Sequence, residues 1–211
     1  MNTNLALKIA SRFGAYGDEA FFAPIWDRVL LPATDQPVQV AHTFFEKAMG
    51  TTHLPDNRCK TLEDTSMHLP GMFPKGNQFL ATGFQVYFMP LNGIGTQERK
   101  TTVHILSRGV MTFTVGNRIY AQIAPLAVLA PSFPMYAAYD DQALRRLLLA
   151  GPSIEPGTQL KRESPRGWEI TPVLIPEMQT FLVQIDFESL HVRTPGHLGV
   201  IIDGFLYRQV Q

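Results

Sequence analysis

The clearest pattern in the chain is a short alternation of apolar and polar side chains near its middle. Apolar residues alternate with two threonines from Met111 to Val115, and a second strand-like run covers residues 118–123. A period of two places every apolar side chain on one face of a strand. The Gly116-Asn117 pair between the runs fits a two-residue type II′ turn, because glycine tolerates a positive φ at the first central position. The sequence therefore predicts a β-hairpin here.

Strand-like segments rich in aromatic and β-branched residues recur along the chain, each bounded by Pro or Gly. Besides the hairpin, the expected strands are residues 78–89, 101–106, 126–130, 168–175, 180–187 and 200–207. About eight to ten short strands with irregular connections favour an antiparallel sandwich or barrel over alternating βαβ units. Two Greek keys in a double sheet, the jelly roll, fit this number of strands. We therefore expect an all-β protein with a single jelly-roll β-sandwich domain over residues 21–211.

Helix signals are scarce. Residues 3–16 are the best candidate, because Leu5, Ile9 and Phe13 form a one-sided apolar stripe. We expect residues 1–20 to form a short helix or arm that either docks on the core or reaches a neighbouring subunit or a membrane surface. Two further segments are ambiguous: residues 42–49 have the length for one or two helical turns, and residues 140–149 fit either a short helix or a buried strand. Residues 50–76 form a long, turn-rich loop, and such loops usually have a function.

The composition narrows the function. The 211 residues include 18 Lys and Arg against 18 Asp and Glu, and only 17% are charged, whereas an average soluble domain has about 25%. Zero net charge argues against a protein whose main task is to bind the phosphate backbone of a nucleic acid. The single cysteine, Cys59, cannot form an internal disulfide. No stretch approaches the ~18 apolar residues of a membrane span, and the N-terminus lacks a secretory signal pattern, so we expect synthesis in the cytosol.

The sequence contains no recognisable catalytic motif. Cys59 has no protease signature around it, and no Gly-x-Ser-x-Gly motif occurs. Gly93-Ile-Gly95 lacks the third glycine of a dinucleotide loop, and we expect a flexible loop between two strands there. A metal-binding jelly roll of the cupin type would carry His-x-His on a strand, which is also missing, but this function stays open as an alternative. Its metal ligands would come from His42, His68, His104, Glu46 and Glu63. We expect no catalytic residue, no metal and no cofactor.

The aromatic residues are more informative. The chain has 14 Phe and 6 Tyr, and many of them lie in expected loops. Such side chains either fold over the ends of the sandwich or pack into neighbouring subunits, where aromatic residues are enriched. The candidate subunit-interface residues are Leu5, Ile9, Phe13, Phe21, Phe22, Phe44, Phe45, Phe73, Phe133 and Tyr136. A charge-poor surface suits this second interpretation, because an interface between subunits needs few ionic groups.

Two segments carry a resemblance to a known family. Residues 62–74, Leu-Glu-Asp-Thr-Ser-Met-His-Leu-Pro-Gly-Met-Phe-Pro, lead into a strand, and residues 174–183, Leu-Ile-Pro-Glu-Met-Gln-Thr-Phe-Leu-Val, contain a Pro-linked strand start. With these segments, residues 60–190 resemble the jelly-roll major capsid proteins of small icosahedral bacterial viruses (bacteriophages). The resemblance implies a structural subunit of the virion, made in the host cytoplasm, with no enzymatic activity.

The resemblance also implies which partners to expect. Copies of the chain would assemble into an icosahedral shell through jelly-roll edges, loops and the N-terminal arm. Other virion proteins would contact this shell, and the resemblance leaves open whether an internal membrane lies beneath it. The balanced charge favours no direct sequence-specific binding of nucleic acid. An accessory vertex or tail protein of the virion is a further alternative.

Overall fold

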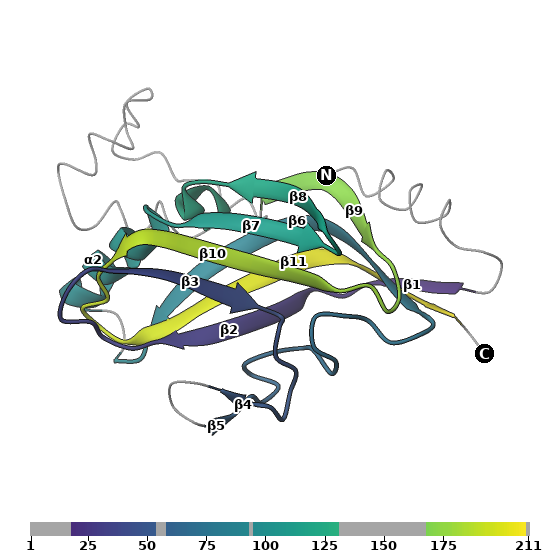
Figure 1. Ribbon diagram of the computed structural model, residues 1–211, viewed down its shortest axis with the longest axis horizontal. Coiled ribbons are helices and arrows are strands. Elements are labelled where there is room, and N and C mark those ends of the chain that lie inside the picture. Colours follow the sequence, from purple (N-terminus) through teal and green to yellow (C-terminus); the bar gives the residue numbers. More distant parts are fainter. Residues whose placement is uncertain (1–17, 54–57, 93–94, 131–167, 210–211) are drawn as a thin grey trace, which may run out of the picture.

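The computed structural model describes residues 18–53, 58–92, 95–130 and 168–209, which form a two-layered β-sandwich with one α-helix (Figure 1). The five-stranded sheet contains β1 (Asp18–Phe22), β2 (Ile25–Leu31), β6 (Asn77–Pro90), β9 (Trp168–Ile175) and β11 (Gly196–Gln209). The four-stranded sheet contains β3 (Val38–Phe44), β7 (Val110–Val115), β8 (Arg118–Ile123) and β10 (Phe181–Leu190). All pairings in both sheets are antiparallel, and the prediction of an all-β sandwich is confirmed.

The strands are ordered as nested pairs. The five-stranded sheet runs β1-β11-β6-β9, with β2 also paired to β11, and the four-stranded sheet runs β3-β10-β7-β8. Because β6 pairs with one edge of β11 along almost its whole length, β1 and β2 share the other edge. The outermost pairing joins β1 and β2 to β11, followed inward along the chain by β3 with β10, β6 with β9, and β7 with β8. Successive pairs therefore alternate between the two sheets.

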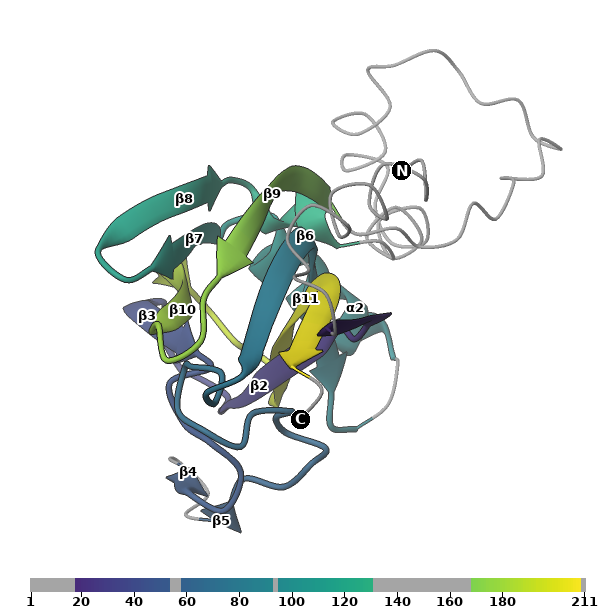
Figure 2. The same ribbon diagram turned by 90° about the vertical axis from the view of Figure 1, so that its right-hand side faces the viewer.

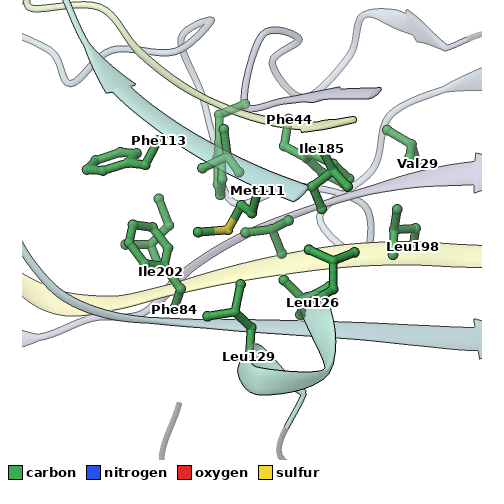
Figure 3. Close-up of a cluster of buried hydrophobic side chains, with 14 of the residues drawn as sticks. Val29, Phe44, Phe84, Met111, Phe113, Leu126, Leu129, Ile185, Leu198 and Ile202 are labelled. Carbon is green, nitrogen blue, oxygen red and sulfur yellow. The ribbon is translucent and has the colours of Figure 1, made fainter. Parts of the chain in front are cut away.

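Apolar side chains fill the space between the sheets. Along β10, buried residues alternate with half-buried ones, as expected for a strand with one face on the core. Phe84 of β6 packs against Phe113 of β7 with ring centroids 5.0 Å apart, and so joins the two sheets (Figure 3). Leu126 and Leu129 of the 3-10 helix η1 (Leu126–Leu129) are fully buried in the same core (Figure 3). The interior of the sandwich is thus a packed hydrophobic core.

The predicted hairpin is confirmed. Val115 of β7 pairs with Arg118 of β8, so Gly116 and Asn117 form the two-residue loop. Gly116 has a φ of +58°, as the first central position of a type II′ turn requires. The predicted strands at residues 78–89, 168–175, 180–187 and 200–207 are confirmed as β6, β9, β10 and β11. The last of these begins four residues earlier than expected, at Gly196.

The predicted strand at residues 101–106 is wrong. These residues form the second half of helix α2 (Thr96–Leu106), so the loop at Gly95 precedes a helix and not a strand. The alternating segment is short, and the preceding Gln, Glu, Arg and Lys favour a helix. The hydroxyls of Thr101 and Thr102 donate hydrogen bonds to the carbonyls four residues earlier, which satisfies these buried polar groups within the helix.

The remaining predictions about local structure need correction or comment. The strand predicted at residues 126–130 is wrong, because residues 126–129 form the 3-10 helix η1. A short apolar run does not by itself distinguish a helix from a strand. Residues 42–44 end β3, so the predicted helical turns at 42–49 are wrong. The expected helix at residues 3–16 and the ambiguous segment at 140–149 lie outside the described residues. The first strand begins at Asp18, three residues before the domain boundary placed at residue 21.

The long loop between β3 and β6 has a structural role. It contains a small ribbon of β4 (Thr52–His53) and β5 (Arg58–Cys59), which stands apart from the sandwich in both views (Figures 1 and 2). A later part of the loop lies along β2: the Arg28 amide donates to the Asp64 carbonyl at 2.8 Å, and the Ser66 amide donates to the Trp26 carbonyl at 3.0 Å. The loop therefore covers the edge of β2 that β11 leaves open.

Candidate functional site

The candidate interface residues fall into three groups in the structure. Those outside the described residues are Leu5, Ile9, Phe13, Phe133 and Tyr136. Phe21 and Phe22 lie on β1, at the edge of the five-stranded sheet, and their exposed fractions are 46% and 58%. Each of these two side chains therefore leaves apolar surface that another molecule can contact.

Phe44, Phe45 and Phe73 were predicted to be interface candidates, and for these three residues the prediction is wrong. All three are buried in the core of the same chain. Phe44 is the last residue of β3, and its side chain points between the sheets (Figure 3). Phe45 and Phe73 lie in the long loop, which folds back over the end of the sandwich, and both rings pack against Phe181 at 5.5 Å. Burial within the subunit removes them from any contact with a partner.

Exposed apolar side chains occur on an edge strand of each sheet. Ile119 and Tyr120 of β8 are 67% and 47% exposed, and β8 ends the four-stranded sheet as β1 ends the other. The remaining large apolar side chains that are exposed among the described residues are Val38, Leu62, Met89, Leu91, Val128 and Met178. Edge strands of soluble proteins normally carry charged residues or Pro, because an apolar edge invites pairing with another chain.

A second apolar cluster lies on the outer face of the five-stranded sheet. Leu80 and Tyr207 are buried there, although they do not belong to the main core. Leu80 lies directly opposite Leu174 on one side and Phe205 on the other, and directly opposite residues share a face. Phe205 in turn lies opposite Phe22, with the two rings edge-to-face at 5.8 Å. The outer row therefore runs from β9 across the sheet to β1, where Phe22 is exposed.

A buried ion pair fixes the long loop to β2. Lys60 donates from Nζ to Asp27 Oδ1, and the two side chains are only 2% and 1% exposed. The backbone amide of Phe45 donates to the other carboxylate oxygen at 2.5 Å. Burial raises the pKa of Asp27, while the charge of Lys60 and these hydrogen bonds oppose that rise. The pair holds a structural connection together and is not accessible to a substrate.

Asp64 forms a second, partly exposed network beside it. Its carboxylate accepts two hydrogen bonds from Arg58, both at 2.8 Å, and one from Arg28 at 2.9 Å. The amide of Thr61 donates a further bond at 2.9 Å. Burial alone would raise the pKa of Asp64, but these hydrogen bonds outweigh it and hold the pKa well below the ordinary value of 3.8.

We expect Asp64 to make the fold sensitive to acid. Its pKa is lower in the folded chain than in the unfolded chain, so its stabilising contribution is complete above about pH 5, begins to fall below about pH 4 and is fully lost only below the folded-state pKa. Asp64→Asn should lower the free energy of unfolding by about 2 kcal/mol at pH 7, because three charge-assisted contacts are weakened. Urea unfolding at pH 7, 5, 4 and 3 measures this effect. The difference between wild type and Asp64→Asn should shrink on acidification, and a constant difference would contradict the assignment.

Sequence reasoning missed both carboxylates. Lys60 lies 33 residues from Asp27, and Arg28 lies 36 residues from Asp64. Arg58 and Thr61 are close to Asp64 in the chain, but they form no recognisable motif with it. One signal was available: Asp27 occupies an inward position of β2, in series with the buried Ile25 and Val29. A carboxylate at a core position needs a cation or hydrogen-bond donors, and this requirement predicts a partner without identifying it.

The residues proposed as metal ligands do not form a recognisable metal site. The exposed candidates are Glu46, Glu63 and His68. His42 lies on β3 with its ring 6.4 Å from that of Phe187, whereas His104 lies on α2. Within the described ranges, no group of three or more His, Cys, Asp or Glu side chains is arranged to hold a metal ion. Cys59 is exposed on β5. The cupin alternative therefore gains no support from the described residues.

Comparison with known proteins adds no family assignment. No family model matches the chain, and a search of curated protein sequences finds no match. No helix among the described residues is long and apolar enough to cross a membrane. Functional inference thus depends on the fold and on the exposed apolar edges.

Proposed function

We propose that this protein is a structural subunit of a virion, a capsid protein with a single jelly-roll domain that assembles with copies of itself. The nested strand pairs support the jelly-roll assignment. The first strand position pairs with the last, the second pairs with the second-last, and so on. This order results when one long antiparallel ribbon winds into two sheets. A double sheet of two Greek keys, typical of viral capsid domains, has this arrangement.

The packed interior favours a structural role over a ligand-binding one. Jelly rolls that bind metals or small molecules need room and polar groups between the sheets. Here the two sheets meet through side chains such as Phe84, Met111 and Phe113, all with no exposed surface (Figure 3). The buried polar groups Asp27 and Lys60 satisfy each other. Few polar groups inside the described part of the sandwich are left to bind a ligand or to act in catalysis.

The observation that carries the proposal is the exposure of apolar side chains on β1 and β8. Both strands end a sheet, and each presents two large apolar side chains that are 46% to 67% exposed. Exposed apolar side chains at a sheet edge suit a subunit that buries this edge in an assembly. Charged residues are confined to the start of each strand, Asp18 and Glu19 in β1 and Arg118 in β8. The low overall charge of the chain agrees with this interpretation. The contribution of the N-terminal arm rests on its sequence pattern alone.

The size of the purified particle tests the proposal. Light scattering and negative-stain microscopy at near-neutral pH should show closed particles much larger than a single chain. A compact dimer with one bound metal ion per chain would contradict the proposal and favour the cupin alternative. An isolated trimer or pentamer that never grows would instead favour the accessory vertex or tail protein.

A charge on β8 should reduce assembly without unfolding the subunit. Ile119 is the most exposed large apolar side chain among the described residues. Ile119→Lys places an ammonium group there, and its burial against a partner would cost more than about 1 kcal/mol per contact. Particle yield should fall at least severalfold in size-exclusion chromatography. Gln39→Lys, at an exposed polar position of β3 at the opposite edge of the same sheet, is the matched control and should assemble normally. Undiminished yield with Ile119→Lys would exclude β8 as a contact.

A further inference from the structure

We infer that β1 is a self-pairing edge, which a second copy of this chain extends by antiparallel pairing centred on Ala20. The inference rests on the proposed function, because it names one contact through which subunits would assemble. It joins the five-stranded sheets of two copies across a two-fold axis. Such an interface uses the same five residues from both partners.

The backbone of β1 presents unused hydrogen-bonding groups at this edge. Ala23 donates its amide proton to the Gly204 carbonyl at 3.0 Å, so this residue directs its polar groups toward β11. In antiparallel pairing the direction alternates with each residue. Phe21 therefore also faces β11, while Ala20 and Phe22 direct their N–H and C=O groups away from it. Among the described strands, none pairs with that side of β1.

The two strands that share the edge of β11 differ in how they are protected. β2 is covered by the long loop, through the backbone bonds of Arg28 and Ser66. No described segment covers β1 in this way, and Ala20, Phe21 and Phe22 are all exposed. An edge with unpaired backbone groups and exposed apolar side chains is a template for pairing with another chain, and an identical strand is the partner that is always present.

The sequence of β1 selects the register. When Ala20 lies on the two-fold axis, Asp18 of each copy opposes Phe22 of the other, and all three pairs exchange two backbone hydrogen bonds. A register centred on Phe21 would instead place Asp18 opposite Pro24, which has no amide proton. The Ala20 register also keeps the acidic residues apart, because Glu19 then opposes Phe21 and no two carboxylates face each other.

Side-chain packing favours the same register. Ala20 and Phe22 share the outer face of the sheet, as their opposite residues Tyr207 and Phe205 do. Two small alanine side chains would lie at the axis. The exposed ring of Phe22, at the end of the outer row in each copy, would then lie close to the other copy. The outer rows of the two copies then lie on one continuous sheet face, where each Phe22 lies opposite Asp18 of the other copy.

Disulfide cross-linking tests the register directly. In a Cys59→Ser background, Ala20→Cys places two thiols at the axis, about 5.5 Å apart between Cα atoms, a separation that a disulfide spans. Mild oxidation with glutathione should yield covalent dimers on non-reducing gels. Phe21→Cys in the same background is the matched control, because its two Cα atoms would be more than about 7 Å apart. Cross-linking of Phe21→Cys instead, or of neither variant, would overturn the inference.

A proline variant tests the free edge without cysteine chemistry. Ala20→Pro removes an amide that points away from β11, so the subunit should fold with an unchanged urea midpoint, as edge strands tolerate such prolines. Association measured by sedimentation should weaken about tenfold or more, because the central hydrogen bonds are lost. Ala20→Thr, which keeps the amide, should associate normally. Undiminished association of the proline variant would contradict the inference.

The outcomes separate this inference from the proposed function. Large particles without a cross-link through Ala20 would overturn β1 pairing and leave the capsid proposal standing. Cross-linked dimers that never form larger particles would support β1 pairing and contradict the capsid proposal.

Discussion

Lys60→Met is expected to lower the free energy of unfolding by about 3–5 kcal/mol at pH 7, because it leaves a buried carboxylate without its cation. Lys60 and Asp27 are 2% and 1% exposed, so water cannot replace the lost ammonium group. Burial already raises the pKa of Asp27, and without Lys60 nothing but hydrogen bonds would oppose that rise. Urea unfolding followed by circular dichroism measures the change.

The pH dependence of this variant provides a second readout. With the folded-state pKa of Asp27 raised above its unfolded value, a proton binds the folded chain more tightly. The deficit of Lys60→Met should therefore be largest at neutral pH and should shrink as the pH falls through the folded-state pKa. The double variant Asp27→Asn, Lys60→Met keeps an acceptor for the Phe45 amide but no charge, and it should lose less stability than Lys60→Met alone. An equal or larger loss in the double variant would show that the ion pair is not the cause.

Phe73→Ala is expected to cost a similar amount, about 3–5 kcal/mol, through the cavity that it leaves. The ring of Phe73 is stacked between Phe79 at 5.3 Å and Phe181 at 5.5 Å, and it is 6% exposed. It connects the long loop to both sheets, since Phe79 lies on β6 and Phe181 on β10. The midpoint of urea unfolding should fall accordingly. Leu62→Ala, in the same loop but 57% exposed, is the control and should change stability by less than about 0.5 kcal/mol.

The residues that suggested a capsid family include several with a clear structural task. Gly71 has a φ of +52°, and a Cβ atom there would lie 2.6 Å from the Phe181 carbonyl oxygen. Its own carbonyl accepts the Phe181 amide at 2.7 Å. A glycine followed two residues later by phenylalanine thus fits the loop closely against β10. An unchanged free energy of unfolding for Phe73→Ala would show that the loop does not depend on the packing of Phe73. The sequence of the loop would then need another explanation.

The candidate interface was only partly predictable. Aromatic residues in loops could be recognised as side chains that need burial, but sequence alone did not show whether the burial was within the chain or between chains. Phe22 and Phe45 illustrate the difference: both belong to adjacent Phe pairs, yet the first is 58% exposed and the second is fully buried. Phe45 has a positive φ of +68°, and its amide donates a hydrogen bond to Asp27, which lies on a strand distant in the chain. Both features arise where two distant segments meet.

The sequence by itself determined the local features of this protein, and only the tertiary structure decided how they combine. Alternation and a glycine turn specify the β7–β8 hairpin, because period and turn geometry are properties of neighbouring residues. Other features depend on segments that are far apart in the chain. They are the nested strand order, the Asp27–Lys60 pair, and the contrast between the covered edge of β2 and the exposed edge of β1. The energy of such contacts comes from burial and pairing in three dimensions, which a linear pattern does not encode.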